Sequence, residues 1–260
     1  MKIGLEYEGV IVSWDGDITR WKSIPENLRS KICKLAEDEF PCDNYDCLAE
    51  ARMHVPVENP TVDSLSKAFF DRVSKVDMAF KAYGYSVVWG EQKIPEKIHE
   101  EILQEFDLSV KAGVRKKKLT FRISNLGVSD YWSHGNMFRG GGIHINVSHV
   151  LPRDATGMAL SLRTILQPYQ FGRFMSNYRN ELLFRFRSAE DTRESIAEFL
   201  SFGWNMGGSP NDQVTVNRAK HWMGVIIEEA KEHITGPVWM PLRRPNGGLD
   251  LPSFLSSARP

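Results

Sequence analysis

The stretch KIGLEYEGVIV, residues 2–12, decides how the fold of this chain is interpreted. Its apolar content favours a β-strand, and side chains in a strand point alternately to the two faces of a sheet. One face then carries Ile3, Leu5, Tyr7 and Ile11, and the other carries Gly4, Glu6 and Glu8. Two acids on one face belong either to a surface exposed to water or to a site that binds a cation. The other strands of the chain must distinguish these two interpretations.

The composition is that of an ordinary globular protein. The chain has 260 residues, of which 42% are hydrophobic and 25% are charged, and its formal net charge is zero. A neutral chain has no overall field that would attract nucleic acid or a membrane surface. We expect a single catalytic domain over residues 1–237 and an irregular tail over residues 238–260 that packs on it.

Nothing in the sequence indicates export or membrane insertion. The N-terminus lacks the basic and apolar segments of a signal peptide, and no apolar run approaches the ~20 residues that cross a bilayer. The cysteines are Cys33, Cys42 and Cys47, an odd number that is too small for a disulfide scaffold and fits a reducing compartment. We therefore expect a cytoplasmic protein without a membrane partner.

The residue patterns predict a mixture of strands and helices. Further strands are expected at residues 47–57, 85–90, 119–124, 143–150 and 181–188, with a return strand after the turn at Asp15 and Gly16. Helices are expected at residues 25–40, 61–83, 95–106, 154–167, 191–202 and 212–233, with Thr61 and Asp154 as N-caps. Residues 125–142 are rich in turn formers. This mixture favours an α+β fold, in which a curved, mainly antiparallel sheet has helices on one face and a polar face opposite.

Three more strands carry functional side chains on their polar faces. They are Glu50, Arg52 and His54 in the second strand, His144, Asn146 and Ser148 in the strand at 143–150, and Glu181, Arg185 and Arg187 in the last. Same-face neighbours in a strand lie roughly 6.5–7 Å apart, so two carboxylates can each hold one of a pair of divalent cations. Carboxylates with an imidazole suit Mg²⁺ or Mn²⁺, and arginines suit phosphate or carboxylate. Together they predict a site for phosphoryl transfer.

A structural interpretation competes with this one. Glu-x-Glu is common on exposed strands, and an isolated His144 is more often a hydrogen-bonded structural residue. Arg185 and Arg187 could form surface ion pairs with Glu181 that contribute little to stability. We favour a common site because the same residue types recur on four strands and because glycines at 140–142 precede His144.

These residues resemble the glutamine synthetase and glutamate–cysteine ligase superfamily, most closely its phage-encoded carboxylate–amine ligases. The similar motifs are Gly4-x-Glu6-x-Glu8, the segment DNYDCLAEAR with Glu50, and GGGIHINVS with His144. The resemblance implies a glutamine synthetase-like catalytic domain in which Glu6, Glu8, Glu50 and His144 bind metal. It implies nucleotide contacts from Gly141, Gly142, Asn146 and Ser148, and catalytic arginines at Arg187, Arg52 and Arg179.

The function that the resemblance implies is an ATP- and Mg²⁺- or Mn²⁺-dependent ligase, which forms an amide through an acyl phosphate. Its substrates would be a small carboxylate and amine, or such groups on a macromolecule, and a phage-encoded copy would work in the host cytoplasm. Two positions depart from the family pattern. Arg185 stands where the last strand normally has an acid, and Asn146 stands where a second histidine is usual.

The departures keep two other functions open. One is a catalytically inactive descendant of this fold that acts as a phage-encoded protein-binding or inhibitory factor. The other is a different two-metal enzyme such as a nuclease. The basic run at residues 115–118 fits a solvated loop better than a nucleic-acid contact. Substrate specificity would reside in loops 125–142 and 203–212, and neither the substrates nor the oligomeric state can be read from them.

Overall fold

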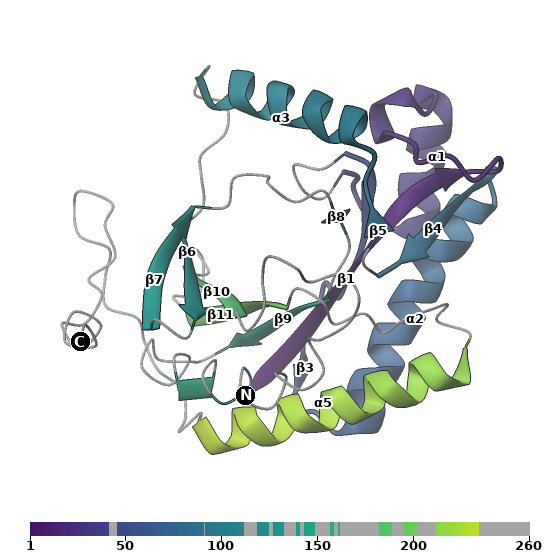
Figure 1. Cartoon of the computed structure of the whole chain (residues 1–260). Helices are drawn as coiled ribbons and strands as arrows, with labels where there is room; N and C mark the ends of the chain where they lie inside the picture. Colours follow the sequence, from purple (N-terminus) through teal and green to yellow (C-terminus); the bar gives the residue numbers. More distant parts are fainter. Residues whose placement is uncertain are drawn as a thin grey trace.

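The computed structural model describes residues 1–41, 46–90, 92–111, 119–124, 127–132, 139–140, 143–148, 157–158, 161, 182–188, 195–201 and 212–233. These residues form an open nine-stranded sheet with helices packed against it (Figure 1), and every strand pairing in it is antiparallel. The predicted α+β class with an antiparallel sheet is therefore confirmed.

The main sheet has the strand order β2-β1-β9-β11-β10-β6-β7, and β3 and β4 also pair with β1. Its strands are β1 (Lys2–Ser13), β2 (Leu48–Arg52), β3 (Val57–Glu58), β4 (Tyr85–Trp89), β6 (Leu119–Ser124), β7 (Gly127–Trp132), β9 (Ile143–Ser148), β10 (Leu182–Ser188) and β11 (Ser195–Ser201). A small second sheet pairs β5 (Gln92–Lys93) with β8 (Arg139–Gly140). The helices are the short 3-10 helix η1 (Trp21–Ser23), α1 (Glu26–Ala36), α2 (Val62–Lys81), α3 (Glu96–Lys111) and α5 (Gln213–His233).

β1 pairs with four strands, more than any other strand that the structure describes. It pairs with β2 and β3 along one edge and with β9 and β4 along the other. Gly9 permits the pairing with β4, because a Cβ at this position would lie 2.5 Å from Val87 Cγ1 and 2.9 Å from the Val88 carbonyl oxygen. Only glycine lets the two backbones approach this closely.

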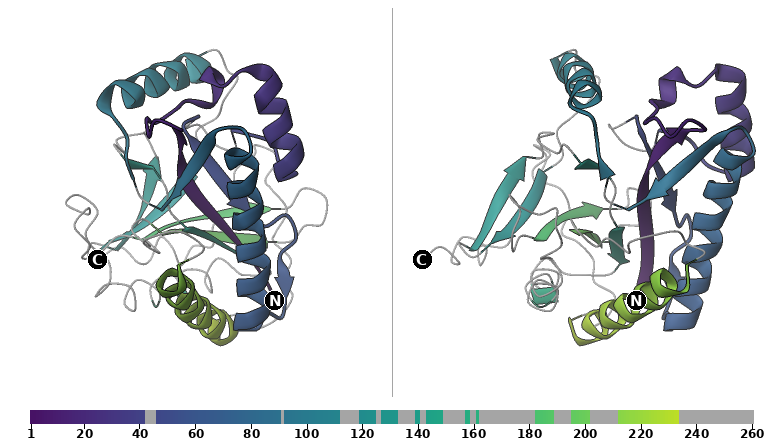
Figure 2. Two further views of the ribbon diagram at one scale, coloured as in Figure 1. Left: turned by 90° about the vertical axis from the view of Figure 1, so that its right-hand side faces the viewer. Right: turned by 45° about the vertical axis from the view of Figure 1, so that its right-hand side comes forward.

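The hydrophobic core lies between the apolar face of the sheet and the helices. Ile3, Leu5, Tyr7 and Ile11 are buried there, as the alternation in β1 predicts, together with Phe69 and Phe80 from α2 and Trp222 and Ile226 from α5. Figure 2 shows α2 running alongside β1 in both views. Thr61 caps α2 as predicted: its Oγ1 accepts a hydrogen bond from the Ser64 backbone N–H at 3.2 Å.

A second, smaller core lies at the other face of the sheet, beneath α3. Val10 and Leu48 lie opposite each other in β1 and β2, and they pack with Cys47, Ile94 and Ile102. Val10 lies on the same face of β1 as Glu6 and Glu8, because it is separated from each of them by an even number of residues. α3 therefore closes one end of the polar face with an apolar wall.

One predicted helix is wrong. Residues 191–202 were expected to be helical, but residues 195–201 form β11, which lies between β9 and β10 in the middle of the sheet. A short apolar run such as SIAEFL fits a helix or a fully buried strand equally well. Pairing on both edges decides in favour of the strand, since tertiary contacts override a weak local preference.

Other boundaries differ in smaller ways. The return strand after Gly16 is a single bridge between Val12 and Ile18, and turn-rich residues 125–142 include β7 and β8. The predicted strand at 47–57 is interrupted after Arg52, and Val55 is 79% exposed, although alternation from Ala49 and Ala51 would place it on the apolar face. The helix predicted at 95–106 continues to Lys111, while those at 25–40 and 212–233 are found as α1 and α5.

Some predictions lie outside the described residues. They are most of the helix at 154–167, the tail at 238–260, Gly141, Gly142, Arg179 and the acid Glu181. Within the part of the chain that the structure describes, no helix combines the length and apolar character needed to cross a bilayer.

Candidate metal and anion site on the polar face of the sheet

The strand register brings the predicted metal ligands together. Glu8 lies opposite Glu50 in the pairing of β1 with β2, and Glu6 lies opposite His144 in the pairing of β1 with β9. Directly opposed residues in an antiparallel pair project from the same face, with their Cβ atoms ~4.5–5.5 Å apart. The four side chains therefore form one acidic cluster on the face away from the main core.

The acidic cluster is buried. Glu6, Glu8 and Glu50 are 8%, 9% and 7% exposed, so they do not form a solvated strand face. The imidazole of His144 lies between two of them, with Nδ1 3.5 Å from Glu6 Oε2 and Nε2 3.7 Å from Glu8 Oε1. Three buried carboxylates around one imidazole are stable only with protons or a cation among them.

Glu50 shows the electrostatic cost of this arrangement. Its pKa is raised well above the usual range of a glutamate, first by burial and then by the neighbouring charges of Glu6 and Glu8. A hydrogen bond with the Glu6 carboxylate adds to the shift, since it favours protonated Glu50. In the absence of a cation the cluster therefore holds a proton at neutral pH. The donor set of three carboxylates and an imidazole fits Mg²⁺ or Mn²⁺, which would take the place of that proton.

Asn146 and Ser148 are both engaged with the strand next to them. Asn146 Nδ2 donates a hydrogen bond to Glu6 Oε1 at 3.0 Å. The Ser148 hydroxyl donates to the Lys2 carbonyl oxygen at 3.4 Å, and the residue is 5% exposed. Asn146 thus orients a predicted metal ligand, while the nucleotide contacts expected of both residues stay predictions.

Glu198 occupies a register position beside the predicted site, and the sequence analysis missed it. It lies opposite Asn146 in β9 and opposite Arg185 in β10, so one row across the sheet reads Gly4, Asn146, Glu198 and Arg185. The interpretation of residues 191–202 as a helix hid this acid. Arg185 is the signal that could have indicated Glu198, because an arginine at a position where an acid is expected suggests that another strand provides the carboxylate.

Arginines also occur at register positions of the more distant strands β10 and β6. Arg187 lies in the row of Ser148, and Arg122 of β6 lies opposite Leu183 in the row of His144. With adjacent strands ~4.8 Å apart, Arg185 is three strands, or ~14 Å, from the Gly4 position in β1. The register therefore places the arginines of β10 and β6 several strands away from the acids of β1 and β2.

Arg52 is the predicted catalytic arginine whose side chain the structure describes. It lies opposite Glu6 in the register, but its Nη2 donates to Asp38 Oδ1 at 3.1 Å, and its side chain is 38% exposed. A separate group of possible ligands, Glu229, Glu232 and His233, lies at the end of α5, with ligand atoms within 4.8 Å of one another. Acidic groups of this kind are common on exposed helix ends, and nothing ties this one to the polar face.

Comparisons of the chain with protein-family models, with curated proteins and with solved structures gave no match. The functional interpretation therefore depends on the residues and on their arrangement.

Proposed function

We propose that this chain is an ATP- and Mg²⁺-dependent carboxylate–amine ligase. The observation that carries the proposal is the buried cluster of Glu6, Glu8, Glu50 and His144, in a sheet whose far strands contain arginines. Buried like charges destabilise a protein, so a chain that keeps three of them together, two of them beside one imidazole, has a use for them. Holding a divalent cation is the use that this donor set fits best.

The roles within the proposed reaction follow the charge pattern of the face. Glu6, Glu8, Glu50 and His144 would hold Mg²⁺ or Mn²⁺, and the bound metal would neutralise the triphosphate of ATP. Arg187 and Arg185 would stabilise the negative charge of the phosphoryl group as it moves to the substrate carboxylate. An amine would then displace phosphate from the acyl phosphate and leave an amide. Asn146 orients Glu6, and Glu198 would supply the carboxylate that β10 lacks.

Substitution of Glu6 tests this proposal. The purified chain, incubated with ATP, Mg²⁺ and mixtures of acids and amines, should release ADP and phosphate only when an acid is present. Glu6→Gln should reduce this release and the binding of Mg²⁺·ATP at least ten-fold. Glu58→Gln, a change at an exposed acid of β3 that lies outside the cluster, should leave both unchanged. The ligase is refuted if the wild-type chain does not bind Mg²⁺·ATP, or binds it equally well without Glu6.

A second function is favoured by the two departures from the family pattern. Asn146 carries no charge and uses its amide on Glu6, and β10 presents arginine where an acid is usual. These features also fit a descendant of the fold that has lost catalysis and binds another protein. A stable complex with one host protein, formed by a chain that does not bind nucleotide, supports this alternative, and ADP formation dependent on Glu6 excludes it.

A further inference from the structure

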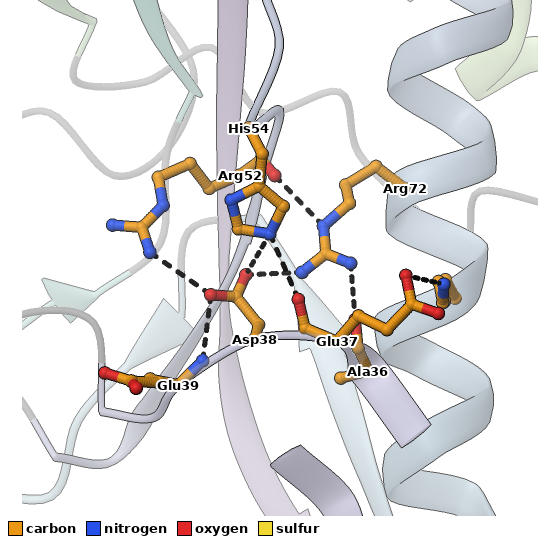
Figure 3. A network of polar contacts seen from close by, with 8 residues as sticks. Ala36, Glu37, Asp38, Glu39, Arg52, His54 and Arg72 are labelled. Atoms are coloured by element: carbon orange, nitrogen blue, oxygen red, sulfur yellow. Dashed lines mark hydrogen bonds and ion pairs between the residues drawn. The ribbon is translucent and has the colours of Figure 1, made fainter. Parts of the chain in front are cut away.

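Asp38 shows how this fold satisfies a buried carboxylate outside the acidic cluster (Figure 3). Its side chain is 2% exposed. Oδ1 accepts hydrogen bonds from Arg52 Nη2 at 3.1 Å and from the Glu39 backbone N–H at 2.9 Å, and Oδ2 contacts Arg72 Nη2. Both oxygens of this carboxylate therefore have partners within the chain, and the network that it forms with the two arginines is structural.

The carboxylate of Glu229, in the last turn of α5, is satisfied less well. Its side chain is 12% exposed, and its Oε2 atom is buried without a hydrogen-bond partner among the residues that the structure describes. The imidazole Nε2 of His233 lies 3.5 Å from this oxygen. A charge-assisted N–H···O bond would bring the two atoms to about 2.7–2.9 Å. Oε2 therefore faces an imidazole nitrogen across a gap that is too long for such a bond.

The sequence of α5 places a third possible ligand beside these two. Glu229, Glu232 and His233 occupy positions i, i+3 and i+4, which are neighbours on one side of a helix. Their ligand atoms all lie within 4.8 Å of one another. The His233 ring is confined on its other side, because a Cβ at Gly157 would lie 3.2 Å from its Nδ1. The ring therefore packs its Nδ1 side against the chain at Gly157 and presents Nε2 to Glu229.

The distance between His233 Nε2 and Glu229 Oε2 distinguishes among cations. Zn²⁺ binds imidazole nitrogen and carboxylate oxygen at ~2.0–2.2 Å, and the tetrahedral angle then separates the two ligand atoms by ~3.4 Å. An octahedral Mg²⁺ ion, with ligands at ~2.0–2.1 Å, would bring them to ~2.9 Å. The observed 3.5 Å fits the tetrahedral ion.

An ion pair between Glu229 and a protonated His233 is the competing explanation. Pairs of this kind at i and i+4 are common on helices and contribute little to stability. An ion pair accounts for the proximity of the two side chains. It does not account for the buried Oε2 without a hydrogen bond, or for the third ligand type on the same side of the helix. A cation between the three groups accounts for both.

We propose that Glu229, Glu232 and His233 bind Zn²⁺ at the last turn of α5, with Glu229 Oε2 and His233 Nε2 as the chelating pair. The negative end of the helix dipole favours a cation at this turn. Three protein ligands leave the fourth tetrahedral position to water or to a ligand atom from outside α5. The zinc site shares no residue with the acidic cluster and does not depend on the ligase function.

A Zn²⁺ titration followed by NMR of the His233 ring, with its signals assigned from His233→Gln, tests the site. We expect a saturable shift at Nε2 in the wild type. The Kd should rise about ten-fold or more in Glu229→Gln and in Glu232→Gln, since each variant loses a ligand. His221→Gln, which removes an exposed histidine of the same helix, should leave the Kd unchanged. The absence of a shift at Nε2, or an unchanged Kd in either glutamate variant, overturns the zinc site.

Urea unfolding of Glu229→Gln distinguishes a metal ligand from a partner in an ion pair. Glutamine keeps the shape of the side chain and removes the charge of a nearly buried carboxylate. The metal-free variant should therefore unfold at a urea concentration no lower than that of the wild type. Zn²⁺ should raise the midpoint of the wild type more than that of the variant. A lower metal-free midpoint together with an equal effect of Zn²⁺ identifies an ion pair and overturns the zinc site.

The zinc site and the ligase can fail independently. Zn²⁺ also fits the acidic cluster, but His144 reports on that cluster through its own ring signals. Glu6→Gln should leave the Kd measured at His233 unchanged, and Glu229→Gln should leave the binding of Mg²⁺·ATP unchanged. A saturable shift at His233 in a chain that never forms ADP supports the zinc site and refutes the ligase. ADP formation without a shift at His233 has the opposite meaning.

Discussion

Replacing Glu50 by glutamine should stabilise the metal-free protein and at the same time weaken its binding of Mg²⁺. Burial and the charges of Glu6 and Glu8 raise the pKa of Glu50 in the folded state, whereas in the unfolded chain it is close to ~4.3. A carboxyl group with a raised folded pKa contributes stability below the unfolded pKa, and this contribution is lost as the pH rises toward the folded value. Each pKa unit corresponds to ~1.4 kcal/mol. Glutamine removes the ionisation, so Glu50→Gln should be more stable than the wild type at pH 8 by on the order of 1–4 kcal/mol, and similar to it at pH 5.

Urea unfolding at pH 5, 6.5 and 8, with and without Mg²⁺, measures this effect. Mg²⁺ at a hundred times its Kd should stabilise the wild type by about 2.7 kcal/mol, which is a rise in Tm of about 5–10 °C for a chain of this size. Glu50→Gln should lose most of that increase, and Glu58→Gln should keep it. The reasoning is refuted if the stability of the metal-free wild type does not fall between pH 5 and pH 8, or if Glu50→Gln has the same pH dependence.

Three other substitutions test the packing and the register. Gly9→Ala should destabilise the protein by about 1–3 kcal/mol in urea unfolding, because its Cβ would overlap β4. Gly4→Ala is the matched control, since its Cβ would have no neighbour closer than 3.6 Å. An equal loss of stability in Gly4→Ala and Gly9→Ala would contradict the close approach of β1 and β4. Arg20→Gln should increase the rate of amide hydrogen exchange throughout α3, because the side chain of Arg20, only 7% exposed, forms an ion pair at 2.8 Å with Glu105 of that helix. Exchange at the wild-type rate would mean that the apolar contacts alone hold α3 in place. Glu198→Gln should weaken Mg²⁺ binding about ten-fold in a calorimetric titration, and unchanged affinity would remove Glu198 from the site.

The central part of the fold could be predicted from local patterns. Alternation over residues 3–8 of β1 separates Ile3 and Leu5 from Glu6 and Glu8, and period two leaves one choice for the face that packs in the main core. The helix α2 could be predicted because Thr61 provides a cap and its apolar residues recur at helical spacing. These elements carry their own signal, since each is long and has one continuous apolar face.

The other strands depend on pairing and packing with distant segments, which local sequence patterns do not predict. The sequence of β11 has apolar residues at both odd and even positions, and periodicity does not distinguish such a strand from a helix. Val55 belongs by alternation to the apolar face of β2, but the strand ends at Arg52, where Arg72 binds the last carbonyl group. The side chain of an α2 residue thus decides where β2 ends.

The interpretation of the polar face changed most at β10. In the sequence, Arg185 stands where the resemblance implies an acid. The strand register identifies an acid on the neighbouring strand β11, since Glu198 lies directly opposite Arg185 and Asn146. An acid and an arginine that a family pattern places on one strand can be distributed over two, because cross-strand neighbours are closer, at ~4.5–5.5 Å, than same-face neighbours along a strand, at ~6.5–7 Å. The departure at Arg185 therefore weighs less against a metal site than it does in the sequence alone, and the burial of Glu6, Glu8 and Glu50 weighs more in its favour.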